Sequence, residues 1–324
     1  MSTMFFYLAK KFCLLVVSLF LVVTLTFFLM HAAPGDPFAE EQALPQEVLD
    51  ALHKHYHLDK PILVQYGYYL KGLVKGDLGP SLKYQGRMAV DVIKDAFPVS
   101  FLLGMEAIFL ATALGITCGS LAALYRGRWQ DRLTMLLAAL GISLPSFLMA
   151  TFLQYLLAIK FDIFPVARWG TPLHTILPAL SLAALPTAFI ARLTRSTMIE
   201  VLAQEFVLTA KSKGLPGRKI FFRHVLRTSI LPVVTYLGPL TASVLTGSFV
   251  VEKIFGIPGL GQWFVQSVSN RDYTLIMALT IFYSAILMAC VFIVDVIYCL
   301  LDPRITWTNS KLLWRRNWRK KSLL

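Results

Sequence analysis

About six stretches of mainly apolar residues alternate with polar stretches along the chain. A helix that crosses the hydrocarbon core of a bilayer needs about 20 such residues, and charged residues are rare within each stretch. The pattern therefore predicts an all-α integral membrane protein with about six transmembrane helices. The predicted spans are Phe12–Met30, Val99–Leu124, Leu133–Ile159, Leu177–Leu193, Leu231–Val251 and Tyr273–Leu301.

A basic stretch, Met198–Pro232, separates the fourth and fifth apolar runs. Apolar residues recur in it at steps of three and four, which predicts helix, and Gly214-Leu215-Pro216-Gly217 interrupts the pattern once. The stretch is interpreted as two helices joined by a tight turn, with Gly214 where a side chain would obstruct close approach. We expect this loop to dock a soluble protein. Its apolar stripe comprises Val201, Phe206, Val207, Ala210 and Gly214, beside Lys211, Lys213, Arg218 and Lys219.

Composition and charge agree with a membrane protein and orient it. Hydrophobic residues make up 56% of the chain, charged residues 15%, and the mean hydropathy is +0.64. Lysine and arginine gather in one alternate set of connections, so the positive-inside rule predicts that both termini are cytoplasmic. The net charge of +13 then faces anionic lipid, and no nucleic acid is needed to explain it. The basic connections hold Lys10 and Lys11, Arg126, Arg128 and Arg132, Arg192 through Arg227, and Arg304 with the tail beyond it.

The first apolar run has a second interpretation, as a cleaved signal peptide. Lys10-Lys11 precedes the run and His31-Ala32-Ala33 ends it, but the run is long for a signal core and His31 occupies a small-residue position. We favour a retained helix. The predicted organisation is then a first helix with an extracytoplasmic insert over residues 1–98, a membrane core over 99–305 with a cytoplasmic loop at about 194–230, and a basic cytoplasmic tail over 306–324.

Two acidic residues, Glu106 and Asp295, fall inside predicted spans. Charged side chains are costly in hydrocarbon, so both are candidates for a translocation path. A structural interpretation competes. Asp295 could lie near the cytoplasmic headgroups or pair with a neighbouring helix, and Glu106 could lie near the outer end of its span. Ser146 and Tyr236 could face the same path or satisfy hydrogen bonds locally.

Small residues and prolines mark packing within the predicted bundle. Gly115 and Gly119 are spaced as GxxxG, which would let another helix approach closely. Membrane helices tolerate proline where neighbours satisfy the freed carbonyl groups. Such breaks suit a bundle whose helices rock against one another. The prolines concerned are Pro145, Pro178, Pro186 and Pro239.

A glycine-rich and apolar loop follows the fifth predicted span, between Phe249 and Tyr273. Its glycine and proline residues prevent a continuous helix, yet it is too apolar for a solvated connection. Irregular backbone at such a boundary is tolerated where it is buried in protein or faces a water-filled cavity. We expect it to fold back over the outer mouth of the path, while the alternative is a turn anchored in lipid headgroups by Trp263. The expected gate residues are Gly259, Leu260 and Gly261.

The sequence offers no enzyme-like constellation. The phosphate-binding pattern GxxxxGK[ST] is missing, so any ATP hydrolysis would belong to a separate chain. The cysteines show no metal-ligand spacing, and no metal site is expected. No internal repeat marks a secondary carrier. Two other classes stay open: a proton-coupled carrier that depends on Glu106 or Asp295, and a structural or insertion component without a substrate path.

Several strings, taken in order, resemble the permease subunits of ABC importers for dipeptides and oligopeptides, and the oligopeptide permease B subunit in particular. The resemblance covers nearly the whole chain. It implies a type I importer bundle, a homologous second permease, two ABC ATPase subunits that use ATP and Mg²⁺, and an extracytoplasmic peptide-binding protein. This chain itself would bind no cofactor, and it would lie in the plasma membrane. The strings are Ala33–Phe38, Leu44–Tyr66, Gly76–Tyr84, Phe206–Gly214, His224–Pro232, Phe249–Tyr273 and Asp302-Pro303-Arg304.

In the resembled family the cytoplasmic loop forms a coupling helix that seats in a groove of the ATPase. By position, the glycine of the family's motif is Gly214 and its Glu-Ala-Ala falls on Leu208, Thr209 and Ala210. The final alanine and the glycine match, and the missing glutamate is similar to the peptide-importer version of the loop. The resemblance implies an ATPase-coupling role for Ala210, Lys211, Lys213, Gly214, Leu215 and Arg218.

Overall fold

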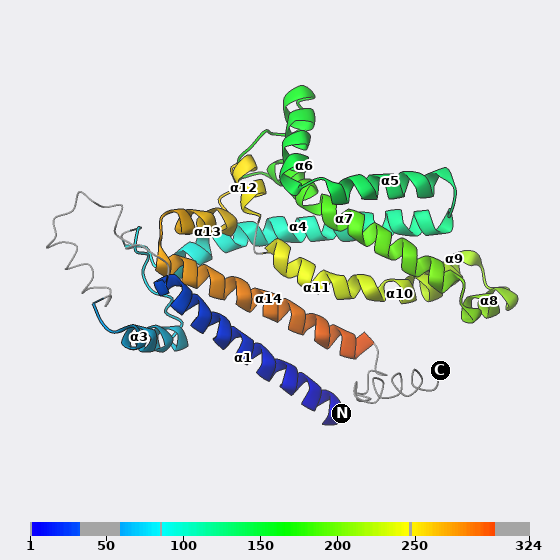
Figure 1. Ribbon diagram of the computed structural model, residues 1–324. Helices are drawn as coiled ribbons and strands as arrows, with labels where there is room; N and C mark the ends of the chain where they lie inside the picture. Colours follow the sequence, from blue (N-terminus) through cyan, green and yellow to red (C-terminus); the bar gives the residue numbers. More distant parts are fainter. Residues whose placement is uncertain (1, 33–58, 85, 246–247, 302–324) are drawn as a thin grey trace, which may run out of the picture.

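The structure, a computed structural model, describes residues 2–32, 59–84, 86–245 and 248–301. Regular structure within these ranges is helical, apart from one isolated antiparallel bridge between Pro80 and Met88. Much of the predicted insert and the whole predicted tail at 306–324 lie outside the described residues. Four long helices extend between the same two ends of the molecule (Figure 1): α1 (Ser2–Ala32), α4 (Ala89–Leu124), α7 (Pro172–Leu202) and α14 (Tyr273–Leu301).

Each long helix contains a stretch that is long and apolar enough to cross a membrane, and two bent helix pairs raise the possible number of spans to six. The expected all-α membrane fold is therefore confirmed. Two of the six predicted spans, the third and the fifth, differ from a single straight helix.

The third predicted span, Leu133–Ile159, is wrong as one continuous helix. It divides into α5 (Trp129–Ser143), α6 (Ser146–Leu153) and the π-helical segment η1 (Gln154–Lys160), with a bend of 109° between α5 and the rest. Leu144 is extended because the proline that follows it disfavours helical geometry, and Pro145 then begins the new direction. As a result α6 points in a different direction from α5 (Figure 1).

The fifth predicted span, Leu231–Val251, is also divided. α11 (Leu231–Leu245) ends early, and a separate short helix, α12 (Phe249–Phe255), follows it. Fifteen helical residues rise only about 22 Å, and the preceding helical stretch Gly217–Ser229 meets α11 at an angle of 48°. This span is thus a bent pair of helices.

Among the described helices, α4 and α7 make the most extensive contact, and glycine makes their close approach possible. A Cβ atom added to Gly115 would lie 2.7 Å from the Ile190 Cβ atom, and one added to Gly119 would overlap the Ala191 carbonyl oxygen. Gly141 of α5 faces α7 in the same way, where a Cβ atom would lie 3.0 Å from the Ala188 Cβ atom. The close packing predicted from the GxxxG spacing is confirmed.

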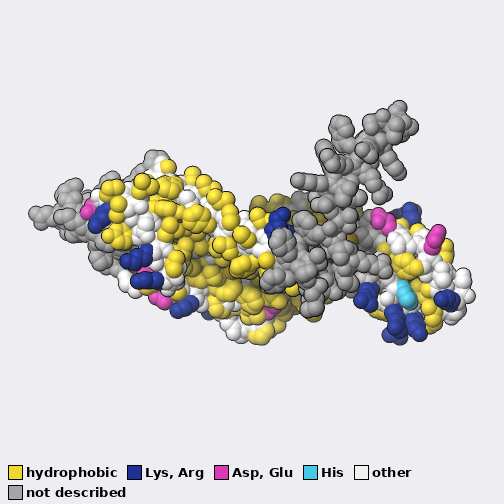
Figure 2. All heavy atoms as spheres, turned by 90° about the horizontal axis from the view of Figure 1, so that it is seen from below, with side chains coloured by type: hydrophobic (Ala, Val, Ile, Leu, Met, Phe, Trp, Pro, Cys, Tyr) yellow, Lys and Arg dark blue, Asp and Glu magenta, His cyan; other side chains and the backbone are white. Residues whose placement is uncertain are grey.

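The two ends of the bundle differ in character. Figure 2 shows broad hydrophobic surface along the helices and a concentration of lysine and arginine at one end, where α8 to α10 lie. We call this the basic end. The opposite end carries α3 (Ile62–Val74) and residues 75–84 and 86–88, and we call it the insert end.

Candidate functional site

The basic end is built by a segment of short helices that follows α7. They are α8 (Glu205–Ser212), α9 (Gly217–Ile220), the π-helical segment η2 (Phe221–Val225) and α10 (Leu226–Ser229), and we call them together the basic segment. The sequence predicted one break in this stretch, at Gly214. The structure has a second break at Ala203 and Gln204, which separates α7 from α8. This turn lets α8 fold back against the end of α7.

The basic segment is held by a small hydrophobic core. Val207 and Ala210 of α8 are buried against the last turns of α7, and Ala123 at the end of α4 joins the same cluster. Phe206, which the sequence pattern placed in the apolar stripe, is instead 39% exposed. The position of the segment is therefore coupled to two long helices. The buried members are Ala123, Met198, Val201, Val207, Ala210, Ile220 and Val225.

The turn at Gly214 is shaped by backbone conformation. Gly214 has a φ of +72°, its N–H donates to the Lys211 carbonyl oxygen at 2.9 Å, and the Leu215 N–H donates to the Ala210 carbonyl oxygen at 3.3 Å. A Cβ atom at Gly214 would meet no atom of the described chain within 4 Å. The glycine is needed here for its left-handed conformation, as at other helix ends, and not for close packing within this chain.

The outward surface of the basic segment mixes charge and apolar area. Lys211, Lys213, Gly214 and Arg218 are exposed, whereas Leu215 is half-buried on the cluster and Ala210 is buried. Large exposed apolar side chains lie in the same segment. Such a rigid surface, basic and partly apolar, suits a protein partner. The apolar side chains are Phe206, Leu208 and Phe222.

The glycine-rich loop forms a helical hairpin, α12 followed by α13 (Leu260–Ser269), around a buried carboxylate. The Glu252 side chain is fully buried. Its Oε1 atom accepts a hydrogen bond from Ser100 Oγ at 2.9 Å, and its Oε2 atom accepts one from the Gln262 N–H at 3.3 Å. Ser100 Oγ in turn accepts the Leu260 N–H at 2.8 Å. Glu252 therefore caps α13 and ties the hairpin to α4.

Gly259 and Gly261 are the residues that allow the carboxylate to sit there. A Cβ atom at Gly259 would lie 2.5 Å from Ser100 Oγ, and one at Gly261 would lie 2.7 Å from the Phe249 nitrogen. Burial raises the pKa of Glu252, while its hydrogen bonds from Ser100 and from main-chain N–H groups oppose that rise. Sequence reasoning missed Glu252; the available signal was an acidic residue among the apolar residues of Phe249–Phe255.

Residues of the insert end cover the hairpin. Trp263 packs edge-on against Tyr84, with ring centroids 5.2 Å apart, and lies 5.7 Å from the Arg87 guanidinium. The buried Asp272 accepts hydrogen bonds from Ser81 Oγ and, at 3.2 Å, from the Leu82 N–H. Trp263 is thus engaged by protein, which favours a folded-back hairpin over a turn anchored in lipid.

The four remaining candidate path residues do not form one cluster in the structure. Asp295 of α14 pairs with Lys11 of α1 at 3.0 Å, so the pairing interpretation is favoured for it. Glu106 is half-buried in the middle of α4 and has no polar partner among the described residues. The ring centroids of Tyr236 and Phe189 lie 4.3 Å apart. Ser146 is the first residue of α6.

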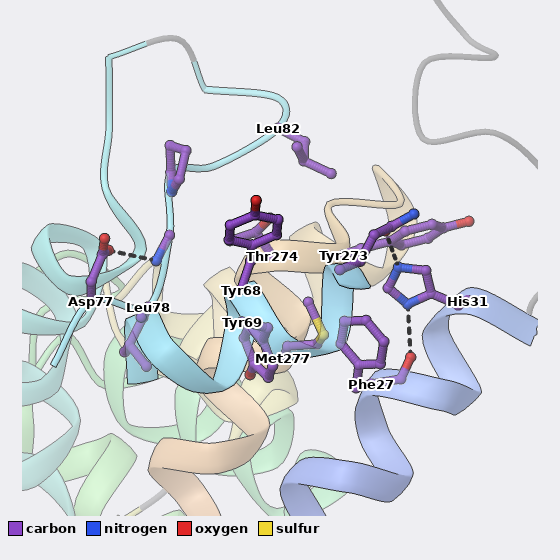
Figure 3. Close-up of a pocket in the computed structure, with 14 residues that line it drawn as sticks. Phe27, His31, Tyr68, Tyr69, Asp77, Leu78, Leu82, Tyr273, Thr274 and Met277 are labelled. Atoms are coloured by element: carbon purple, nitrogen blue, oxygen red, sulfur yellow. Dashed lines mark hydrogen bonds between the residues drawn. The ribbon is translucent and has the colours of Figure 1, made fainter. Parts of the chain in front are cut away.

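A cavity of about 390 Å³ lies at the insert end, between α1, α3 and the first turn of α14. Figure 3 shows aromatic side chains around it, with His31 held between the Phe27 carbonyl oxygen and Gln65. The lining is largely apolar, and within the described chain no group of three His, Cys, Asp or Glu side chains could hold a metal ion. The arrangement suggests no chemical step.

Comparisons with known proteins agree with this architecture. Residues 115–307 match the family described as binding-protein-dependent transport system inner membrane component, and residues 4–104 match its N-terminal component. The chain belongs to this family. It is a multi-pass membrane protein of the permease class.

Individual relatives cover nearly the whole chain. It is 48% identical to the dipeptide transport system permease protein DppB of Bacillus subtilis, over 92% of this chain and 97% of the relative. It is 44% identical to the oligopeptide transport system permease protein OppB of Haemophilus influenzae, over 90% and 95% respectively. The resemblance noted in the sequence is confirmed, and it extends to both kinds of permease.

Solved structures show the same fold at low sequence identity. The MetNI methionine ABC transporter in an inward-facing conformation matches with a TM-score of 0.51 at 15% identity, covering 64% of this chain and 97% of that chain. An amino acid ABC transporter matches with a TM-score of 0.50, covering 64% and 93%. The core of this chain therefore has the fold of ABC importer permeases.

Proposed function

We propose that this chain is the permease subunit of an ATP-driven peptide importer and forms half of its translocation path. The observation that carries the proposal is the basic segment: an exposed, rigidly packed surface at one end of a permease bundle. One of two ATPase subunits, which bind ATP and Mg²⁺, would dock there, and the other would dock on the second permease. A homologous second permease would complete the path, and an extracytoplasmic binding protein would deliver the peptide.

The coupling role is assigned to Ala210, Lys211, Lys213, Gly214, Leu215 and Arg218. Buried Ala210 and half-buried Leu215 fix the turn, while the exposed cations and Gly214 meet the ATPase. With both termini and the basic segment cytoplasmic, the insert end faces outward. The protein would then lie in the plasma membrane, which is the inner membrane where a cell has two.

At the outward side, the α12–α13 hairpin is the proposed gate. Gly259, Leu260 and Gly261 are buried around the Glu252 carboxylate or packed directly beside it, so opening requires this network to break or to move as a unit. Glu106, Ser146 and Tyr236 are proposed for the path. Asp295, although first considered for it, is better assigned to the contact between α1 and α14.

Oligopeptides are the proposed substrate class, and dipeptides, glutathione or nickel chelates are the alternatives on the same scaffold. The relatives include both dipeptide and oligopeptide permeases, so sequence similarity supports peptide transport in either length class. The binding protein sets selectivity in such a system. Identifying the ligand that co-purifies with the cognate binding protein therefore tests substrate length directly.

The proposed function is tested by peptide uptake into proteoliposomes that contain the full complex. Uptake should require ATP and the binding protein, and it should persist when the proton gradient is collapsed. The half-buried, unpartnered Glu106 favours one competing function, a proton-coupled carrier. Uptake that continues without ATP and stops on collapse of the gradient would establish the carrier instead.

A further inference from the structure

A buried ion pair joins α5 to α7 close to the basic segment. Asp131, in the first turn of α5, is 5% exposed. Its two carboxylate oxygens accept hydrogen bonds from Arg195 Nε at 2.5 Å and Nη2 at 2.8 Å, and the Gly127 N–H donates to the same carboxylate at 2.9 Å. A bidentate pair of this kind fixes direction as well as distance, so the inner end of α5 is locked onto α7.

The opposite end of the same bent element reaches the α12–α13 hairpin. Gln154, at the junction of α6 and η1, donates from Nε2 to the Val166 carbonyl oxygen at 2.8 Å and to the Ile254 carbonyl oxygen at 3.3 Å. Ile254 lies in α12, two residues after Glu252. One amide side chain therefore joins η1 to the helix that carries the buried carboxylate of the proposed gate.

The bent element between these contacts is packed against the bundle along its length. α5 also meets α7 at Gly141, where a Cβ atom would lie 3.3 Å from the Ala184 carbonyl oxygen. Pro145 then sets the bend, and Ala150 and Ala158 are buried against the main core. Contacts to α7 and to the main core therefore occur along α5, α6 and η1.

α7 is itself attached to the basic segment. Thr197 Oγ1 donates to the Ser229 carbonyl oxygen at 2.9 Å, and Met198 and Val201 belong to the cluster beneath α8. Arg195 lies less than one turn before Thr197. The ion pair is thus the first polar link from the proposed ATPase-docking surface to the bent element.

We propose that Asp131 and Arg195 are positioning residues for gating: their ion pair transmits movement of the basic segment through α5, α6 and η1 to the α12–α13 hairpin. The inference rests on the proposed function and adds the path by which movement at the basic segment reaches the hairpin. A second connection runs from α4 through Ser100 to Glu252. The ion pair serves a different purpose, since it sets the angle of α5 and so the position of Gln154.

The test uses the complete complex, with native cysteines replaced and a single cysteine at Leu260, which is fully buried in this structure. Labelling by an impermeant thiol reagent is measured in nucleotide-free and ATP-trapped complexes, together with ATPase activity and peptide uptake. Asp131→Asn should keep assembly and ATPase activity within twofold of the wild-type values. It should reduce both the nucleotide-dependent change in labelling and the peptide imported per ATP at least fivefold.

Two further variants separate transmission from simple stability. Asp131→Glu keeps the charge and should restore at least half of the uptake, and the neutral pair Asp131→Asn with Arg195→Gln should assemble but remain uncoupled. Gln154→Leu, at the far end, should give the same uncoupling as Asp131→Asn, and combining the two should add little.

The matched control is a second ion pair among the described residues, Lys11 with Asp295, which joins α1 to α14 outside this route. Asp295→Asn should leave peptide import per ATP unchanged. The inference is overturned if Asp131→Asn leaves the nucleotide-dependent change in labelling and the peptide imported per ATP at the wild-type level. It is also overturned if assembly, ATPase activity and import fall together in all Asp131 variants. Failure of the wild-type complex to show ATP-dependent uptake would instead overturn the proposed function.

Discussion

At the scale of single residues, backbone conformation and buried charge explain the positions that matter most. Gly214 occupies a left-handed conformation at the end of α8, and a Cβ atom added to it would meet no atom within 4 Å. Glu252, by contrast, is surrounded by donors, and two glycines leave room for it. One position is constrained by its φ angle and the other by its neighbours.

Replacing Gly214 tests the turn. Gly214→Val should destabilise the turn by about 1–2 kcal/mol, because a side chain disfavours the left-handed region. ATPase binding to the permease and ATP-dependent uptake should both fall, while membrane insertion is retained. Co-purification of the ATPase subunits and uptake in proteoliposomes measure the two effects.

Gly217→Ala is the control for this change. Gly217 lies in α9, has no positive φ, and has open space where a Cβ atom would be added. Wild-type docking and uptake are expected for it. If Gly214→Val behaves like Gly217→Ala, the turn is not part of the docked surface.

At the scale of elements, close helix contact and proline-directed bends determine how the bundle is assembled. α4 and α7 meet at glycines, whereas Pro145 turns one predicted span into two elements at 109°. The bend places α6 and η1 where Gln154 can reach α12. A straight third span would leave the hairpin without this contact.

Enlarging the α4–α7 contact should separate the two helices. Gly119→Leu places a large side chain against the Ala191 carbonyl group and the Thr194 side chain, so the pair cannot keep its spacing. Overpacking of this kind typically costs about 1–3 kcal/mol. The melting temperature of the purified complex in detergent should fall accordingly.

Gly67→Ala is the matched change on α3, where an added Cβ atom would meet nothing within 4 Å. It should not lower the melting temperature, because alanine favours helix more than glycine does. Equal melting temperatures for Gly119→Leu and the wild type would show that α4 and α7 are not packed as in this structure.

At the scale of the whole molecule, charge and hydrophobicity divide the surface into a basic end, an apolar middle and an insert end (Figure 2). Apolar packing in the middle lies between the Asp131–Arg195 pair at one end and the contact of Gln154 with α12 at the other. The proposed cycle depends on this arrangement, because ATP acts at one end and peptide arrives at the other.

Labelling of single cysteines tests the orientation. Lys75 at the insert end and Ser212 in α8 are both exposed. In a cysteine-free background, Lys75→Cys should react with an impermeant thiol reagent from outside and Ser212→Cys only from inside, because the basic residues favour the cytoplasmic side. Both variants should support uptake, which confirms that the labelled protein is folded. Reaction of both positions from the same side would contradict the proposed topology.

The sequence by itself determined the membrane class, the approximate places of six apolar stretches, the GxxxG contact and the basic segment with its turn. These features follow from local composition and spacing, because hydrocarbon requires long apolar helices and a left-handed turn requires glycine. Tertiary structure alone decided the 109° direction taken after Pro145, the burial of Glu252 beneath α13, and the pairing of Asp131 with Arg195. Residues 64 positions apart in the sequence meet there because α5 and α7 pack side by side, and a pattern read along one chain contains no information on which distant charge will lie opposite.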